Sequence, residues 1–210
     1  MLLSFDKLEH DFGLKMEGVI HIGAHHGQEV PSYIERGVEN ILLFEPQPEC
    51  FDILVDRFAE EDSVLVENLA LGSSVCKNSM YTETANGGQS SSVLKPAIHT
   101  QQYPSIVFNG KIGIDMTTLD KYFEDNDMDP SFYNTINIDV QGYELEVFRG
   151  AESTLEYIDY IITEINRAEV YEGCAKSEDL DEFLGGIGFV RKITDWAGNT
   201  WGDAFYTREK

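Results

Sequence analysis

Two carboxylates follow apolar runs of the kind that form strands of a parallel sheet. Asp139 stands near the end of NTINIDV (134–140), and Glu164 stands near the end of YIDYIITEIN (157–166). Because neighbouring parallel strands end at the same edge of a sheet, we expect both side chains to converge on one bound group. A carboxylate crowded by a second one has a raised pKa, which suits it to remove a proton from a hydroxyl as a general base.

Metal binding is a second chemistry for the same strand ends. Asp139, Glu164 and Asn166 offer the oxygen atoms that a divalent cation prefers, and the cation would acidify a hydroxyl beside it. Glu144 follows at the predicted start of a helix, where its charge suits the helix dipole. The residues leave both chemistries open, and we favour proton removal without a metal.

A glycine turn follows another apolar run, in VIHIGAHHGQE (19–29). Gly23 and Gly27 let the backbone turn tightly and approach a ligand without a Cβ in the way. Glu45 stands at the end of the next predicted strand, where a carboxylate can accept the hydroxyl hydrogens of a ribose. The two features together predict a nucleoside site.

The spacing of the glycines bears on which nucleoside is bound. A dinucleotide needs G-x-G-x-x-G, which seats its pyrophosphate on a helix N-terminus. This chain has G-x-x-x-G, and no Arg or Lys stands near the turn. S-adenosylmethionine carries no phosphate, and its sulfonium cation suits an acidic protein. The turn therefore favours S-adenosylmethionine over a nicotinamide cofactor.

The turn also carries two adjacent histidines, His25 and His26. On a regular element they would point apart, which is poor geometry for joint metal chelation. His21 and His25 have H-x-x-x-H spacing, but they span a strand and a turn. We expect one of the adjacent pair to contact a ligand, the other to be exposed, and no metal at this cluster.

The elements that position these residues alternate along the chain. Apolar runs at 18–22, 40–44, 63–71, 134–140 and 157–166 predict strands, and helical segments follow Pro31 and Pro48, cover 144–157 and start at Ser177. This order predicts an α/β fold with a doubly wound, mostly parallel, Rossmann-like sheet flanked by helices. The tail around AGN predicts a C-terminal antiparallel hairpin. With no internal boundary visible, we expect residues 1–210 to form one domain.

The middle of the chain has a different composition. Residues 72–114 are rich in Ser, Gly, Asn and Thr, which predicts an inserted hairpin with long loops and a last strand at Lys111–Asp115. Loops of this length are usually functional or mobile, so we expect part of the region to form an acceptor site. Polar and aromatic side chains there could hydrogen-bond or stack on a sugar ring, namely His99, Gln101, Gln102 and Tyr103.

The composition limits the classes of partner. The chain has 38 acidic and 15 basic residues and a net charge of −23, a field that repels nucleic acid and anionic membranes. No apolar run approaches the ~20 residues that span a bilayer, and the N-terminus does not resemble a signal peptide. The three cysteines lack C-x-x-C spacing. We expect a cytoplasmic protein and assign no oligomeric state.

Six motifs occur in the order seen in one enzyme family, namely VIHIGAHHGQE, LLFEPQP, ENLALGSS, TTLDKYF, NIDVQGYELEVFRGA and TEIN. Over about residues 17–195 the chain resembles the FkbM-like methyltransferases, which are S-adenosylmethionine-dependent O-methyltransferases of the Rossmann-like class. The most specific of the motifs is NIDVQGYELEVFRGA (137–151). The family often has Asp where this chain has His21, and Glu where it has Gln141.

The resemblance assigns roles to residues at matching positions. It implies that Gly23 and Ala24 face the methionine part of the cofactor and that Glu45 binds the ribose. The predicted cofactor site comprises His21, Gly23, Ala24, His25, Gly27, Glu45, Pro46, Asn68, Leu69, Ala70 and Asp139. The catalytic residues are predicted to be Asp139 and Glu164, and Glu144 belongs to the same acidic motif.

Members of this family methylate hydroxyls of glycans or of small natural products. Because the polar loop at 86–105 suits a neutral glycan, we predict methyl transfer to a sugar hydroxyl. A natural-product acceptor is the first alternative. A glycan-binding module without catalysis and a nicotinamide oxidoreductase are the others.

Overall fold

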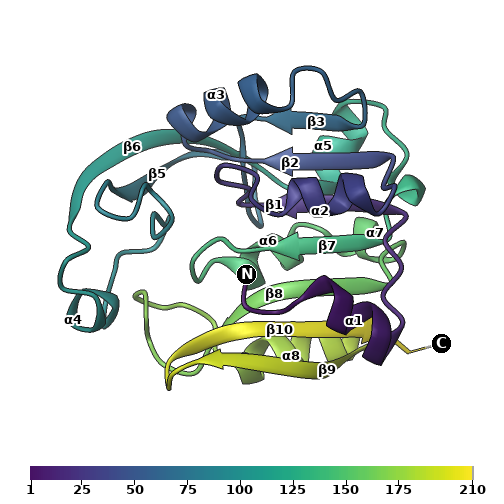
Figure 1. The fold of residues 1–210 in the computed structure, drawn as a ribbon. Coiled ribbons are helices and arrows are strands. Elements are labelled where there is room, and N and C mark those ends of the chain that lie inside the picture. The colour runs from purple at the N-terminus through teal and green to yellow at the C-terminus, as the bar shows by residue number, and fades with distance from the viewer. Residues whose placement is uncertain (210) are drawn as a thin grey trace.

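The computed structural model describes residues 1–209, and its central sheet has seven strands in the order β3-β2-β1-β7-β8-β10-β9 (Figure 1). The strands are β1 Gly18–Ile22, β2 Asn40–Phe44, β3 Val64–Glu67, β7 Thr135–Ile138, β8 Tyr160–Asn166, β9 Phe189–Ala197 and β10 Trp201–Arg208. β10 runs antiparallel to β8 and β9, and the remaining neighbours are parallel. The predicted fold class and C-terminal hairpin are confirmed.

Helices cover both faces of this sheet. They are α1 Phe5–Phe12, α2 Val30–Glu35, α3 Pro48–Arg57, α4 His99–Gln102, α5 Leu119–Asp125, α6 Glu144–Arg149, α7 Glu152–Leu155 and α8 Ser177–Gly186, with a 3₁₀ turn at Pro130–Phe132. Helices α1, α2 and α3 pack on one face, and α5 to α8 pack on the other. Spacing alone did not indicate α1 and α5. Helix α5 is capped by Thr118, whose Oγ1 accepts from the Lys121 N–H at 3.0 Å.

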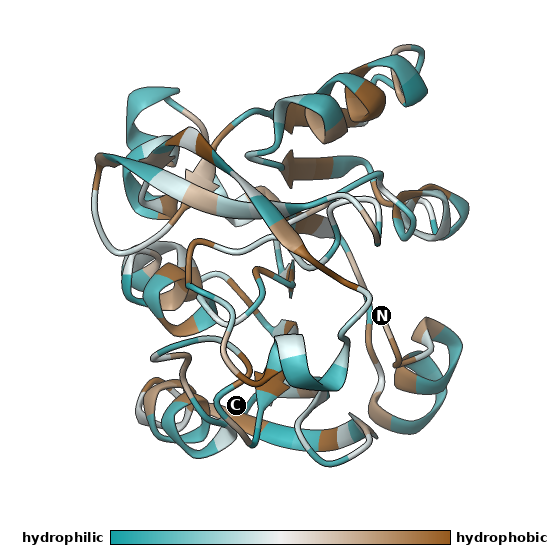
Figure 2. Cartoon of the chain, turned by 90° about the vertical axis from the view of Figure 1, so that its left-hand side faces the viewer, coloured by the Kyte–Doolittle hydropathy of each residue, from teal (hydrophilic) through white to brown (hydrophobic). Residues whose placement is uncertain are grey.

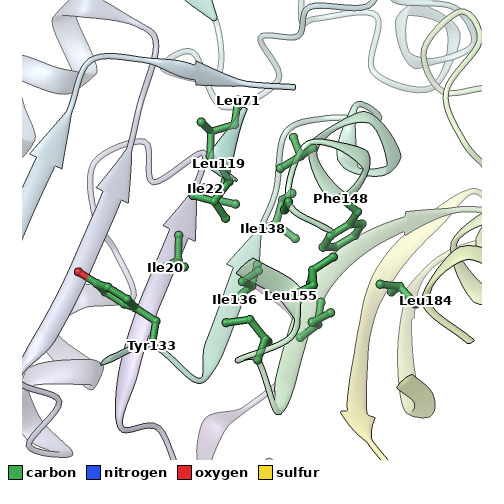
Figure 3. Packing of buried hydrophobic residues seen from close by; sticks show 14 of the residues in the cluster. Ile20, Ile22, Leu71, Leu119, Tyr133, Ile136, Ile138, Phe148, Leu155 and Leu184 are labelled. Carbon is green, nitrogen blue, oxygen red and sulfur yellow. The ribbon is translucent and has the colours of Figure 1, made fainter. Parts of the chain in front are cut away.

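The core follows the alternation of side chains along each strand. In β1, Val19 is buried on the face of α1 and α2, and Ile20 is buried on the opposite face. Figure 3 shows the hydrophobic cluster on the face of Ile20, where Ile20, Ile136 and Phe148 pack between strands and helices. Burial on both faces fixes the strand register, which in turn fixes which residues lie at the strand ends.

A second sheet of three strands, in the order β4-β6-β5, is built mainly from the inserted region. β5 (Cys76–Glu83) pairs antiparallel with β6 (Phe108–Thr117), so the predicted hairpin is confirmed. β4 (Ala70–Leu71) pairs parallel with β6, and the prediction of one strand over 63–71 is therefore wrong. The chain leaves the first sheet at Asn68, whose Nδ2 donates to the Glu45 carbonyl at 2.9 Å.

The predicted single helix over 144–157 is also wrong, because the chain breaks it into α6 and α7 at Gly150. A Cβ at Gly150 would lie 2.0 Å from the Gly72 carbonyl oxygen. The second sheet thus approaches the helix so closely that only glycine fits. This approach fixes where the insertion meets the main sheet.

Strand order reverses between the adjacent parallel strands β1 and β7. Ligands of such sheets bind outside the carboxyl ends at this switch point. Figure 2 views this edge of the molecule, and the connecting segments of the inserted region pass in front of it. None of the helices in residues 1–209 is long and apolar enough to cross a membrane.

Candidate active site

A cavity of about 510 Å³ opens at the switch point. Its walls come from the β1 turn, the ends of β7 and β8, the inserted region and the hairpin strand β10. A smaller cavity of about 50 Å³ adjoins it beside Glu45. Gly23, His25 and Asp139 line both cavities, so the three sequence motifs meet at one place.

The glycines of the turn make room for protein rather than for a ligand. Gly23 has φ +82°, and a Cβ there would lie 2.0 Å from the Asp139 carbonyl oxygen. Its N–H donates to the Phe44 carbonyl at 2.9 Å. Gly27 lines neither cavity, because it packs against the ring of Phe58. The turn is therefore held against β2, α3 and the end of β7.

Glu45 is buried, with 2% of its surface exposed. Its Oε2 accepts from the His25 N–H at 2.8 Å, and its Oε1 accepts from the Gln47 N–H at 2.8 Å. Burial raises the pKa of Glu45, and these hydrogen bonds oppose the rise. Oε1 also accepts from Gln47 Nε2 at 3.3 Å. Because each carboxylate oxygen can accept two hydrogen bonds, Oε2 retains capacity for a ribose hydroxyl.

The inserted region closes over this carboxylate. The His25 Nε2–H donates to the Gly87 carbonyl at 2.7 Å, and Gln47 Nε2 donates to the Gly88 carbonyl at 3.3 Å. Both glycines have positive φ. Gly88 and Gln89 of this segment line the small cavity, together with Glu45 and Gln47.

The two adjacent histidines stack, with ring centroids 3.8 Å apart, so the expectation that they point apart is wrong. The reason is the left-handed backbone of His25, at φ +49°. His26 is half-buried and lines neither cavity. His25, His26 and Cys50 place ligand atoms within 4.8 Å of one another, but both ring nitrogens of His25 already have partners, Gly87 O and Gln28 Nε2.

His21 is buried in the floor of the larger cavity, and burial lowers its pKa to about 4. The Tyr33 hydroxyl accepts from Asn137 Nδ2 at 2.6 Å and donates to His21 Nδ1 at 3.3 Å. The ring is therefore neutral at physiological pH and held in one tautomer by this chain of hydrogen bonds. A neutral imidazole stands here where an aspartate would carry a charge.

Asp139, Glu144 and Glu164 each place a carboxylate oxygen within 4.8 Å of the others. Asp139 is open to the cavity, and Glu164 is buried. Burial raises the pKa of Glu164 well above its ordinary value, and the charges of Asp139 and Glu144 raise it further. Exclusion of solvent by the cavity walls also raises the pKa of Asp139. The expected convergence of the two strand-end acids is therefore present.

Glu144 begins α6, as predicted, and is buried. Its Oε1 accepts from the N–H groups of Val140 at 3.1 Å and Gly142 at 3.0 Å, so the side chain closes the turn between β7 and α6. Burial raises its pKa to about 7. Asn166, considered above as a metal ligand, is buried, lines neither cavity and does not belong to the cluster.

Helix α4 and the hairpin wall the far side of the larger cavity. His99 and Tyr103 line it, whereas Gln101 and Gln102 are exposed and line neither cavity. The Trp201 Nε1–H donates to the Tyr103 hydroxyl at 3.0 Å, and Gln102 Nε2 donates to Thr200 at 2.9 Å. The insertion and the hairpin are thereby joined across the cavity.

The other residues predicted for the cofactor site divide between the two cavities. Glu45, Pro46, Leu69 and Ala70 line the smaller one, His21 and Ala24 line the larger one, and Asn68 lines neither. Among the residues of the larger cavity that sequence reasoning missed are Met1, Glu29, Trp201 and Asp203. Asp203 lies opposite Glu164 in the β10–β8 pairing, and the pattern of an antiparallel hairpin could have indicated only that one of its strands pairs with β8.

The charge of the larger cavity is one-sided. Glu29, Asp139, Glu164 and Asp203 line it, and within residues 1–209 no Lys or Arg lines either cavity. Burial raises the pKa of Asp203 to about 6. A ligand of this site therefore meets carboxylates and neutral groups, apart from the Met1 ammonium, which lies 3.4 Å from Glu29 Oε1.

Comparisons with known proteins agree with this architecture. Sp1610 of Streptococcus pneumoniae, solved in complex with S-adenosyl-L-methionine, aligns with a TM-score of 0.52 at 14% identity, over 100% of this chain and 74% of that one. Magnesium protoporphyrin IX methyltransferase ChlM of Synechocystis PCC 6803, solved with bound SAM, gives 0.51 at 12% identity, over 97% and 76%. At these identities the likeness concerns the fold, which is that of the Rossmann-like methyltransferases.

Sequence comparison narrows the relationship. The chain is 24% identical over 161 residues to the 2-O-methyltransferase NoeI of Sinorhizobium fredii, a match that covers 74% of this chain and 65% of that relative. The chain thus spans about two thirds of the relative's length. The model of the methyltransferase FkbM domain matches residues 21–191, which include the glycine turn, Glu45 and all three clustered acids. This chain belongs to the FkbM methyltransferase family.

Proposed function

We propose that the protein transfers a methyl group from S-adenosylmethionine to a hydroxyl of a sugar. The observation that carries this proposal is the single cavity in which the glycine turn, the Asp139–Glu164 pair and an aromatic wall meet. A general base beside a cofactor turn suits an alcohol acceptor, because a neutral hydroxyl is a poor nucleophile. The relative NoeI is a 2-O-methyltransferase, which points the same way.

The residues present suit S-adenosylmethionine. Glu45 offers acceptor capacity for the ribose hydroxyls, and Leu69, Ala70 and Tyr143 form apolar walls beside it that suit an adenine ring. The glycine turn at Gly23 and Ala24 faces the larger cavity, which leaves that cavity for the methionine part and the acceptor. With four carboxylates in the lining, the site suits a cationic ligand.

Bound S-adenosylmethionine supplies an electrophilic methyl group attached to a sulfonium sulfur. Asp139, which is open to the cavity, accepts the proton of the acceptor hydroxyl as the new oxygen–carbon bond forms and the carbon–sulfur bond breaks. Glu164 lies buried behind it and keeps the pKa of the pair high enough for proton transfer. The products are the methyl ether, the demethylated cofactor and a proton.

The acceptor wall favours an uncharged sugar. Tyr103 and Trp201 offer flat faces and a shared hydrogen bond beside the carboxylates, an arrangement that suits a pyranose ring. His99 Nδ1 is buried and has no hydrogen-bond partner among the described residues, so a turn of the ring toward a sugar hydroxyl would supply one. An anionic sugar would meet four acidic side chains, against which the lining offers one cation, the Met1 ammonium, already paired with Glu29.

The test is calorimetry with S-adenosylmethionine and its demethylated product, followed by transfer of a labelled methyl group to a panel of acceptors. We expect micromolar binding of both compounds and methyl-ether formation on neutral sugars, with little on uronic acids or sugar phosphates. Transfer only to non-sugar hydroxyls would replace the glycan by a natural-product acceptor. Sugar binding without cofactor binding would instead indicate a glycan-binding module, and absence of both kinds of binding would reject the proposal.

A further inference from the structure

Gln141 is an unusual residue in the turn between β7 and α6. Its backbone lies in the left-handed region at φ +55°, where a non-glycine residue is strained by about 1 kcal/mol or more, and Gly142 follows at φ +97°. The structure holds it there with contacts from two other segments. Ser92 Oγ donates to its carbonyl at 2.8 Å, and the Tyr171 hydroxyl, shared with the Ser90 carbonyl, donates to its Oε1 at 2.7 Å.

The side-chain amide of Gln141 reaches both strand-end acids. Its Nε2 lies 2.6 Å from Asp139 Oδ1 and 3.0 Å from Glu164 Oε2. An amide nitrogen carries two hydrogens, so one hydrogen is available for each carboxylate. The Tyr171 hydroxyl fixes the orientation of the amide, because its donation to Oε1 turns Nε2 toward the acids.

Two carboxylates this close repel each other, and within residues 1–209 no Lys or Arg lines the cavity. The Met1 ammonium there is paired with Glu29, and it lowers the pKa of Asp139 less than burial raises it. Two shared N–H donors reduce that repulsion and fix the relative orientation of the two groups. A bridging cation would also reduce the repulsion, but it would add a positive charge, whereas the amide is neutral. The pair therefore keeps its ability to take up a proton.

We propose that Gln141 is the positioning residue of the active site, holding Asp139 and Glu164 in the arrangement that removes the acceptor proton. The left-handed backbone points the amide toward the acids. Hydrogen bonds from Ser92 in the inserted region and from Tyr171 in the segment after β8 hold it in this orientation. This inference rests on the proposed function, and it adds a role for a residue that lines both cavities.

The decisive variant is Gln141→Gly. Glycine adopts φ +55° without strain, so it preserves the turn and removes only the amide. The matched control is Asp127→Gly, at an exposed turn residue with φ +52° that lies outside both cavities. Gln141→Glu, which has nearly the same shape, removes both donors and adds a charge. It provides a second variant if the glycine protein fails to fold.

The first readout needs no activity. Carboxyl groups labelled with ¹³C are titrated by NMR, with Asp139→Asn used to assign the signals. The groups that face the pair also titrate or carry charge, namely Glu29, Glu144, Tyr171, Asp203 and the Met1 ammonium. We expect Gln141→Gly to raise the apparent pKa of the pair by about one unit and Gln141→Glu to raise it further, with Asp127→Gly unchanged. An unshifted titration in both Gln141 variants overturns the proposal.

The second readout is turnover against pH at saturating cofactor. We expect Gln141→Gly to lower kcat ~10²-fold with cofactor Kd within about twofold, and to move the ascending limb of the profile to higher pH. A residue that only shaped the turn would leave this limb in place, and that result also overturns the proposal. If wild type neither binds nor turns over S-adenosylmethionine, the proposed function fails, and the NMR titration still decides whether the amide holds the two acids.

Discussion

On the proposed function the molecule has a cofactor half and an acceptor half, and the chain assembles them in different ways. The first comprises β1, β2 and the turn at 23–27, and it is made of short segments close in sequence whose backbone groups bind one another. The second joins α4 of the insertion to the hairpin, in contacts such as Tyr103 with Trp201 that span 98 positions. The acids at the ends of β7 and β8 lie where the two halves meet. Changes in each half should therefore affect different steps of the reaction.

The largest effect is expected at this meeting point, for Asp139→Asn. The amide cannot accept the acceptor proton, so kcat should fall ~10²- to 10⁴-fold, the usual contribution of a general base. Cofactor Kd, measured by calorimetry, should stay within about threefold. Asp195→Asn on the exposed edge strand β9 is the control and should match wild type. Unchanged turnover of Asp139→Asn would remove this residue from the mechanism.

A variant of Glu144 tests whether this buried carboxyl group takes up a proton when the protein folds. Its pKa rises from 4.5 to about 7 on folding, so the native state binds the extra proton between these values. The stability that this proton confers is present below pH 4.5 and is lost as the pH rises through about 7. Relative to Glu144→Gln, which does not titrate, wild type should lose on the order of 3 kcal/mol of unfolding free energy between pH 4.5 and pH 8.

Chemical denaturation at a series of pH values measures this difference. The titration of His21, whose pKa is lowered to about 4, changes stability in the opposite sense but occurs in both proteins and cancels. A difference that does not vary with pH would show that Glu144 keeps its charge in the folded protein.

In the cofactor half, Glu45→Gln should weaken the binding of S-adenosylmethionine about 10- to 100-fold, because hydrogen bonds to a charged group contribute ~1.5–3 kcal/mol. At saturating cofactor kcat should be nearly unchanged. Glu67→Gln is the control, since Glu67 ends the neighbouring strand β3 but lines neither cavity. Equal losses in both variants would mean that Glu45 acts through the fold alone.

How far the sequence predicts each half follows the same division. The glycine turn, Glu45 and the paired acids could be located from apolar runs and the residues that follow them, because burial on both faces of a sheet leaves a local pattern. The breaks at Asn68 and Gly150 could not, since both depend on the second sheet lying against the first. The sequence indicates the C-terminal hairpin, but no local pattern around Trp201 and Asp203 indicates that they line the site. Left-handed His25 and Gln141 were likewise hidden, because turn residues other than glycine carry little sign of their conformation.

In the acceptor half, Trp201→Ala should raise the KM for the sugar acceptor about 3- to 10-fold, the magnitude of a lost aromatic contact. Cofactor affinity and kcat should change little, because the residue lies on the wall opposite Glu45's cavity and lines only the larger one. Tyr157→Ala removes an exposed aromatic residue outside both cavities and serves as the control. An unchanged acceptor KM in steady-state assays would place the sugar elsewhere.

The smallest effect, none, is expected from removal of divalent cations. Asp139, Glu144 and Glu164 are the residues that would hold an ion, yet the Gln141 amide already binds oxygens of two of them, and Glu144 Oε1 accepts from two backbone N–H groups. An ion would have to displace these donors before it could ligate the cluster. Turnover in excess chelator should therefore stay within about twofold of the untreated enzyme. If turnover is lost and Mg²⁺ or Mn²⁺ restores it, the cluster exchanges the amide for a metal ion. The acids between the two halves would then be held by an ion rather than by hydrogen bonds.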